Sequence, residues 1–151
     1  MILCLPKGIC SWNFDLSASG HCASVEFDWM GEQGSITIDG KPHEVRKHGM
    51  FSGQWTLEAN STTLATARKS NPFTRSFDLE TSSGAVVLRA ESAFGRTMLL
   101  EGSDFHAVIA PAHPFTRRAS ITGQVPDFRI ACFAFWLAAL VWRRAARSNS
   151  S

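Results

Sequence analysis

The feature that most constrains the fold of this 151-residue chain is an unbroken apolar segment close to its C-terminus. Residues 130–142 include no polar side chain other than Cys132. Their bulky members cannot share one stripe of a helix, so a helix formed here would be apolar on every face. Such a helix must be surrounded either by protein or by lipid.

The residues that flank this segment favour a helix with defined ends. Asp127 can cap the N-terminus, where a carboxylate also interacts favourably with the helix dipole. Three arginines follow the apolar run within five residues, where the dipole favours cations. We therefore predict a helix over residues 127–146 and a frayed tail over residues 148–151.

The length of the apolar run favours protein over lipid as its surroundings. At 1.5 Å per residue it spans roughly 20 Å, whereas the hydrocarbon core of a bilayer is about 30 Å thick. We expect a buried core helix, with the apolar side chains Phe133, Trp136, Leu137 and Leu140 at its centre. The alternative is a tail-anchored protein, with residues 128–142 inserted in lipid and a soluble β head.

The chain before residue 126 alternates between short strand-like segments and turn signals. In segments 12–16 and 25–29, apolar side chains fall at every second position, which is typical of a half-buried strand. Asp39-Gly40 is a dipeptide that favours a tight hairpin. We predict twelve strands, over residues 2–5, 10–17, 24–29, 35–39, 43–48, 54–59, 63–69, 74–80, 85–91, 97–101, 105–110 and 117–122.

The number of strands and the apolar helix are consistent with one closed barrel. About eight strands make a barrel that side chains alone can fill, so twelve leave an interior that needs a filler. One helix, about 10 Å across, has the right size. The sequence thus predicts a mainly β fold, a closed and roughly twelve-stranded antiparallel barrel around one C-terminal hydrophobic helix. It forms a single domain over residues 1–147.

The sequence also contains an internal repeat. The segment 71–75 ends in Pro-Phe-Thr-Arg, and the same four residues end the segment 113–117, 42 residues later. Each copy follows a Leu-containing strand, a turn and an Ala-containing strand. We interpret the copies as two similar β modules, with Phe73 and Phe115 pointing inward and Arg75 and Arg117 pointing outward.

At the level of pattern, the chain resembles the tubby C-terminal-like superfamily, which includes tubby domains, LURP-one-related proteins and phospholipid scramblases. The segments that carry this resemblance are 55–58, 64–69, 77–79, 87–89, 99–102 and the helical 135–137. The resemblance implies a twelve-stranded barrel with a central helix and, more weakly, phosphoinositide binding. No scramblase-type arm or calcium loop is found, so scramblase activity is not carried over.

No motif in the sequence indicates an enzyme. There is no HExxH, GxSxG, GxGxxG or Walker motif, and the four cysteines form no CxxC pair. Cys132 lies inside the apolar run and is interpreted as a buried, reduced thiol. We therefore expect a non-enzymatic domain without a metal or cofactor, located in the cytoplasm, either free or peripheral at the membrane.

Basic residues are the remaining candidates for a binding site. Residues 1–40 contain one basic residue and five acidic ones, so the excess of positive charge lies after residue 40. Guanidinium groups bind phosphate and carboxylate, so an anionic lipid head group or a protein partner is expected. A net charge of +2 argues against nucleic acid. The alternative is that each cation pairs with a carboxylate on a neighbouring strand. The candidates are Arg75, Arg117, Arg118, Arg46 and Lys47.

Overall fold

The protein, described from a computed structural model over residues 1–49, 53–71, 73–102 and 104–149, is a closed antiparallel β-barrel around a C-terminal helix. The predicted fold class is therefore confirmed. The strands are β1 (Ile2–Pro6), β2 (Phe14–Ala18), β3 (His21–Phe27), β4 (Gly34–Ile38), β5 (Lys41–Lys47), β6 (Gln54–Ala59), β7 (Thr62–Lys69), β8 (Ser76–Thr81), β9 (Gly84–Ala90), β10 (Met98–Gly102), β11 (Phe105–Pro111) and β12 (Ala119–Gln124).

Each strand of the barrel pairs with its neighbours in the sequence, and β1 pairs with β12 to close the sheet. At the closing seam Ile2 lies opposite Ile121, and Cys4 lies opposite Ala119. Along β2, Phe14 and Leu16 are buried while Asp15 and Ser17 are exposed. This alternation, which strands have because successive side chains point to opposite faces, directs one apolar set into the barrel.

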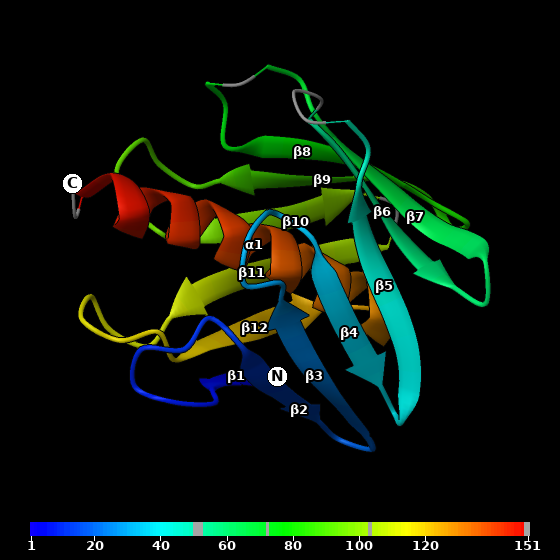
Figure 1. Cartoon of the computed structure of the whole chain (residues 1–151), viewed down its shortest axis with the longest axis horizontal. Helices are drawn as coiled ribbons and strands as arrows, with labels where there is room; N and C mark the ends of the chain where they lie inside the picture. The colour runs from blue at the N-terminus through cyan, green and yellow to red at the C-terminus, as the bar shows by residue number, and fades with distance from the viewer. Residues whose placement is uncertain (50–52, 72, 103, 150–151) are drawn as a thin grey trace.

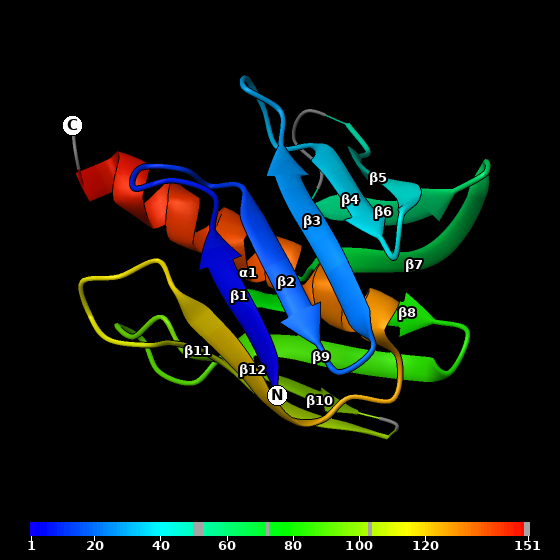
Figure 2. The same ribbon diagram turned by 90° about the horizontal axis from the view of Figure 1, so that it is seen from below.

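The helix α1 (Phe128–Asn149) runs through the barrel, as Figures 1 and 2 show. Every residue from 130 to 143 is buried. Asp127 acts as the predicted cap, because its Oδ1 accepts the backbone N–H of Arg129 at 3.0 Å. The helix continues through Ser148 and Asn149, and residues 150–151 lie outside the described residues.

Aromatic contacts lock the helix to the barrel wall. Phe135 meets Phe14 edge to face, with ring centroids 4.8 Å apart. Trp136 stacks on Phe27 at 4.6 Å, and its Nε1–H donates to the carbonyl of Glu26 at 3.2 Å. The four predicted core residues, Phe133, Trp136, Leu137 and Leu140, are fully buried.

The prediction for residues 10–17 was wrong at its start. The strand β2 begins at Phe14, and residues 7–13 form a loop closed by the Lys7 N–H, which donates to the carbonyl of Asn13 at 2.8 Å. The hairpin at Asp39-Gly40 is as predicted, with both residues at positive φ (49° and 80°) between β4 and β5.

Candidate anion-binding site at the loop end

The two ends of the barrel differ in the length of their connections. Consecutive antiparallel strands place every connection that follows an odd-numbered strand at one end, and every connection that follows an even-numbered strand at the other. We call the first the loop end; its connections are 7–13, 28–33, 48–53, 70–75, 91–97 and 112–118. We call the second the turn end, and most of its connections are only two residues long.

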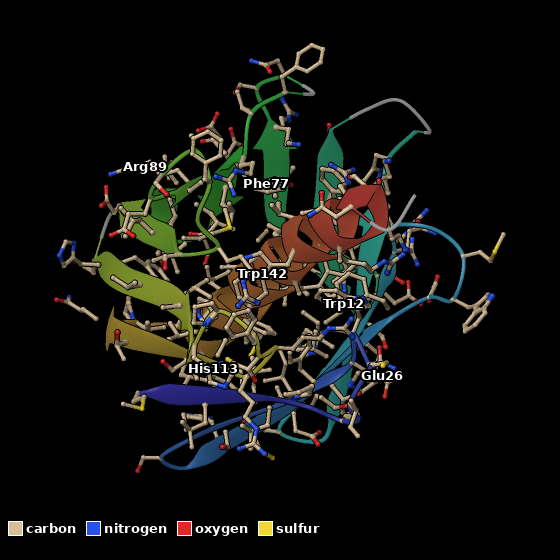
Figure 3. All side chains as sticks on the ribbon, turned by 90° about the vertical axis from the view of Figure 1, so that its left-hand side faces the viewer. Trp12, Glu26, Phe77, Arg89, His113 and Trp142 are labelled. Atoms are coloured by element: carbon tan, nitrogen blue, oxygen red, sulfur yellow. The ribbon has the colours of Figure 1, made fainter. Side chains whose placement is uncertain are left out.

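The helix emerges at the loop end, where the C-terminus is marked in Figure 1. Figure 3 looks onto this end and labels Trp142, which belongs to the helix, and Trp12, which belongs to the 7–13 loop. Trp142 Nε1–H donates to the carbonyl of Arg96 at 2.8 Å, and the buried Arg143 donates to the carbonyl of Gly31 at 2.5 Å. The helix therefore ties loops from opposite sides of the barrel together.

Three arginines, Arg75, Arg96 and Arg117, occupy the same place in three successive loops, 21 residues apart. The guanidinium of Arg75 donates to the carbonyls of Ser92 and Gly95, the latter at 2.7 Å, both in the next loop. Arg117 donates to the carbonyl of Ser11 at 3.0 Å and lies 3.9 Å from the ring centroid of Trp12. Each arginine thus braces the neighbouring loop around the barrel.

Arg96 makes the largest set of these contacts. Its guanidinium donates to the carbonyls of His113 (3.0 Å), Pro114 (2.9 Å) and Thr116 (2.8 Å). Burial lowers the pKa of Arg96, although a guanidinium remains charged at neutral pH. The sequence repeat did not reveal Arg96, because its loop has Ala93 and Gly95 where the other two copies have Pro and Thr.

These three arginines keep their positive charge unneutralised. Among the ion pairs of the described residues, none involves Arg75, Arg96 or Arg117. Carbonyl partners accept hydrogen bonds without carrying a formal charge, and each guanidinium has five N–H donors. The arrangement therefore leaves a net positive field at this part of the loop end.

The three arginines surround one hollow of about 400 Å³ beside the last turns of α1. Its lining also includes the aromatic residues Trp12, Phe94, Phe115 and Trp142. Cationic donors around an aromatic-walled hollow can bind an oxyanion, because a guanidinium offers paired N–H groups in the geometry that phosphate accepts.

The predicted candidates divide into two groups. Arg75 and Arg117 line the hollow, whereas Arg118 is exposed and does not belong to its lining. Arg46 pairs with Glu58 (3.4 Å) and Lys47 pairs with Glu32 (2.7 Å). For Arg46, the alternative of an ion pair with a neighbouring strand therefore describes the structure, whereas the partner of Lys47 lies in the 28–33 loop. Arg46 and Lys47 do not join the arginines of the loop end in one site.

Glu32 also receives the Arg144 guanidinium, with Nη2 at 2.6 Å from Oε1. The hydrogen bond from Arg144, with that from Lys47, outweighs burial and lowers the pKa of Glu32 to about 2. The carboxylate therefore stays charged over a wide pH range. It fastens the 28–33 loop to the end of the helix.

The prediction that Phe73 and Phe115 point inward was wrong. Both lie in loops and are 94% and 95% exposed. The loops turn outward because Asn71 Oδ1 accepts the N–H of Phe73 (2.9 Å) and His113 Nδ1 accepts that of Phe115 (3.2 Å). The two copies are nevertheless equivalent in position, each following an odd-numbered strand. Pro72 of the first copy lies outside the described residues.

A larger cavity, of about 850 Å³, lies at the turn end beside the start of α1. Its lining includes His21, whose Nδ1 lies 2.7 Å from Asp39 Oδ2, and Phe128, which stacks on the His21 ring. The hydrogen bond from His21 lowers the pKa of Asp39. None of the predicted anion-binding residues lines this cavity.

Within the described part of the chain, no three His, Cys, Asp or Glu side chains are grouped to hold a metal ion. Cys4 and Cys132 are buried, and burial raises the pKa of both thiols. Of the helical segments that the structure describes, none has the length and apolarity needed to span a membrane.

Comparison with known proteins gives no match, either to a protein-family model, to a curated protein or to a solved structure.

Proposed function

We propose that this protein is a non-enzymatic binding domain that holds phosphate-bearing head groups of anionic lipids at its loop end. The observation that carries the proposal is the hollow lined by Arg75, Arg96 and Arg117, whose charges no carboxylate neutralises among the described residues. We also propose a relationship to the tubby-like superfamily, supported by the twelve-stranded barrel around a C-terminal helix. A cytoplasmic protein at the membrane periphery fits both proposals.

The chemistry of the head group is tested first with a soluble probe, pyrophosphate, by isothermal titration calorimetry at low salt. The double variant Arg75→Ala/Arg117→Ala should weaken binding by about tenfold or more, since a charge-assisted hydrogen bond contributes about 1.5–3 kcal/mol. Raising the salt should weaken the wild type as well, because screening shortens the reach of the charges to a few Å near 1 M.

The matched control is Arg89→Ala, which removes one positive charge from the barrel wall, where Arg89 pairs with Glu101 at 3.4 Å. Arg75→Lys and Arg117→Lys keep the charge but lose the paired N–H geometry, so they should bind less tightly than wild type. If Arg89→Ala lost as much affinity per charge removed as the double variant, only net charge would matter. Absence of pyrophosphate binding by the wild type would overturn the proposal.

A further inference from the structure

Large apolar side chains project from five of the six connections at the loop end. They are almost fully exposed, and they are Ile9 (99%), Trp29 (90%), Met30 (82%), Phe73 (94%), Phe94 (99%) and Phe115 (95%). We call these six side chains the apolar tips. The remaining connection, 48–53, includes residues outside the described part of the chain.

The turn end offers an internal comparison, because it belongs to the same barrel and faces the same solvent. Its tight turns consist of polar or small residues, namely Ser19-Gly20, Asp39-Gly40, Asn60-Ser61 and Ser82-Ser83. In the part of the chain that the structure describes, none of the large exposed apolar side chains belongs to these turns. The three outside the loop end are Met1, Leu3 and Leu5, at the N-terminus and along β1.

Folding does not explain the apolar tips. A side chain that is more than 80% exposed buries little area, so it adds almost nothing to the stability of the barrel. Single exposed apolar residues are ordinary, but a set confined to one end marks an interaction surface. The repeated placement, with Phe73, Phe94 and Phe115 each 21 residues apart, shows that the tips recur with the hairpin itself.

Four of the five loops that carry the tips also contain a basic residue, whereas the fifth, 28–33, contains Asp28 and Glu32 and no basic residue. In three loops the arginine that braces the next loop comes two residues after the phenylalanine, as in Phe94 and Arg96. An aromatic ring at the tip and a guanidinium behind it match the layers of a bilayer, in which apolar groups enter the acyl region and cations stay at the phosphates.

We propose that the loop end is a membrane-docking surface whose apolar tips insert into the bilayer. A fluid lipid surface is the occupant that fits, because the tips project from five different loops around one end of the barrel. Lipid chains can surround apolar side chains that project from several loops at once. The choice of an anionic bilayer rests on the proposed function of the arginine-lined hollow, which lies between the tips Phe94 and Phe115.

The test is co-sedimentation with vesicles of phosphatidylcholine, alone or mixed with phosphatidylserine, at low and high salt. The triple variant Trp29→Ser/Met30→Ser/Phe73→Ser, which changes three tips that do not line the hollow, should lose at least 100-fold in vesicle affinity, because burying even one such side chain corresponds to about tenfold or more. It should still bind soluble pyrophosphate as the wild type does. The matched control, Leu3→Ser/Leu5→Ser on the barrel wall, should keep its vesicle affinity.

A second readout reports insertion directly. Brominated lipids should quench a component of the tryptophan fluorescence that disappears in Trp29→Phe, because Trp29 is a tip. The two proposals can fail separately. If the wild type binds no pyrophosphate but binds vesicles, and the triple variant does not bind them, the head-group proposal is overturned and insertion stands. Insertion is refuted if the triple variant sediments like the wild type, or if the wild type binds no vesicles. It is also refuted if light scattering shows that the tips join two copies of the chain instead.

Discussion

Removal of the Trp136 side chain tests whether the helix is the core of this fold. Trp136 is fully buried inside the barrel, stacks on Phe27 and donates to the carbonyl of Glu26 at 3.2 Å. The Trp136→Ala variant would therefore leave a cavity between α1 and the wall, and it would leave one backbone carbonyl without its donor.

The expected loss follows from these two contributions. Truncation of a buried aromatic side chain to alanine costs about 3–5 kcal/mol, and the lost hydrogen bond adds about 1 kcal/mol. Domains are stable by only about 5–15 kcal/mol, so the variant loses a large share of its free energy of unfolding. In a chain of this size, 1 kcal/mol corresponds to about 2–4 °C in Tm, which predicts a fall of roughly 10–20 °C.

Thermal and urea unfolding, followed by circular dichroism, measure this loss. Phe94→Ala is the matched control, because it also truncates an aromatic side chain, but one that is 99% exposed. It should change stability by no more than about 0.5 kcal/mol. Trp136→Phe keeps an aromatic ring but loses the N–H donor and part of the buried volume, so it should fall between the two. If Trp136→Ala and Phe94→Ala melted together, the helix could not be the core.

Three further predictions follow from buried and ion-paired groups. Gly34→Ala should lower Tm, because a Cβ there would lie 2.0 Å from the carbonyl oxygen of Glu26, which is backbone and has no room to shift. Since the folded pKa of Glu32 is about 2, well below its ordinary value of 4.5, its ion pairs stabilise the protein above pH 4.5. That contribution, about 3 kcal/mol at most, should be lost as the pH falls toward 2 in urea titrations, and Glu32→Gln should lack this part of the acid sensitivity. A thiol reagent should modify the exposed Cys10 and Cys22 in the native protein, whereas the buried Cys4 and Cys132, with raised pKa, should react only on unfolding; rapid reaction of all four would contradict the packing.

The repeat found in the sequence is twice as long as the repeat found in the structure. The sequence comparison found two copies 42 residues apart, whereas the structural unit is a hairpin of about 21 residues. The copy between them carries Phe94 and Arg96 with Ala93 and Gly95 in place of the Pro and Thr, so a tetrapeptide search passes over it. The signal present in the sequence was the Phe-x-Arg spacing, at 73, 94 and 115.

The sequence by itself determined the strands, the helix and the way they combine. Strand alternation is local, and a helix apolar on every face must be enclosed, so both follow from the order of the residues. Only the tertiary structure decided where Phe73 and Phe115 point and what Arg75 and Arg117 contact. The direction of a loop side chain depends on the particular hydrogen bonds of its turn, which differ from loop to loop. The partners of these arginines lie in the next hairpin around the barrel, far away in the sequence. Closure of the sheet was expected from the strand number and the enclosed helix, but the contact it creates between Ser11 and Arg117 is not encoded by local pattern.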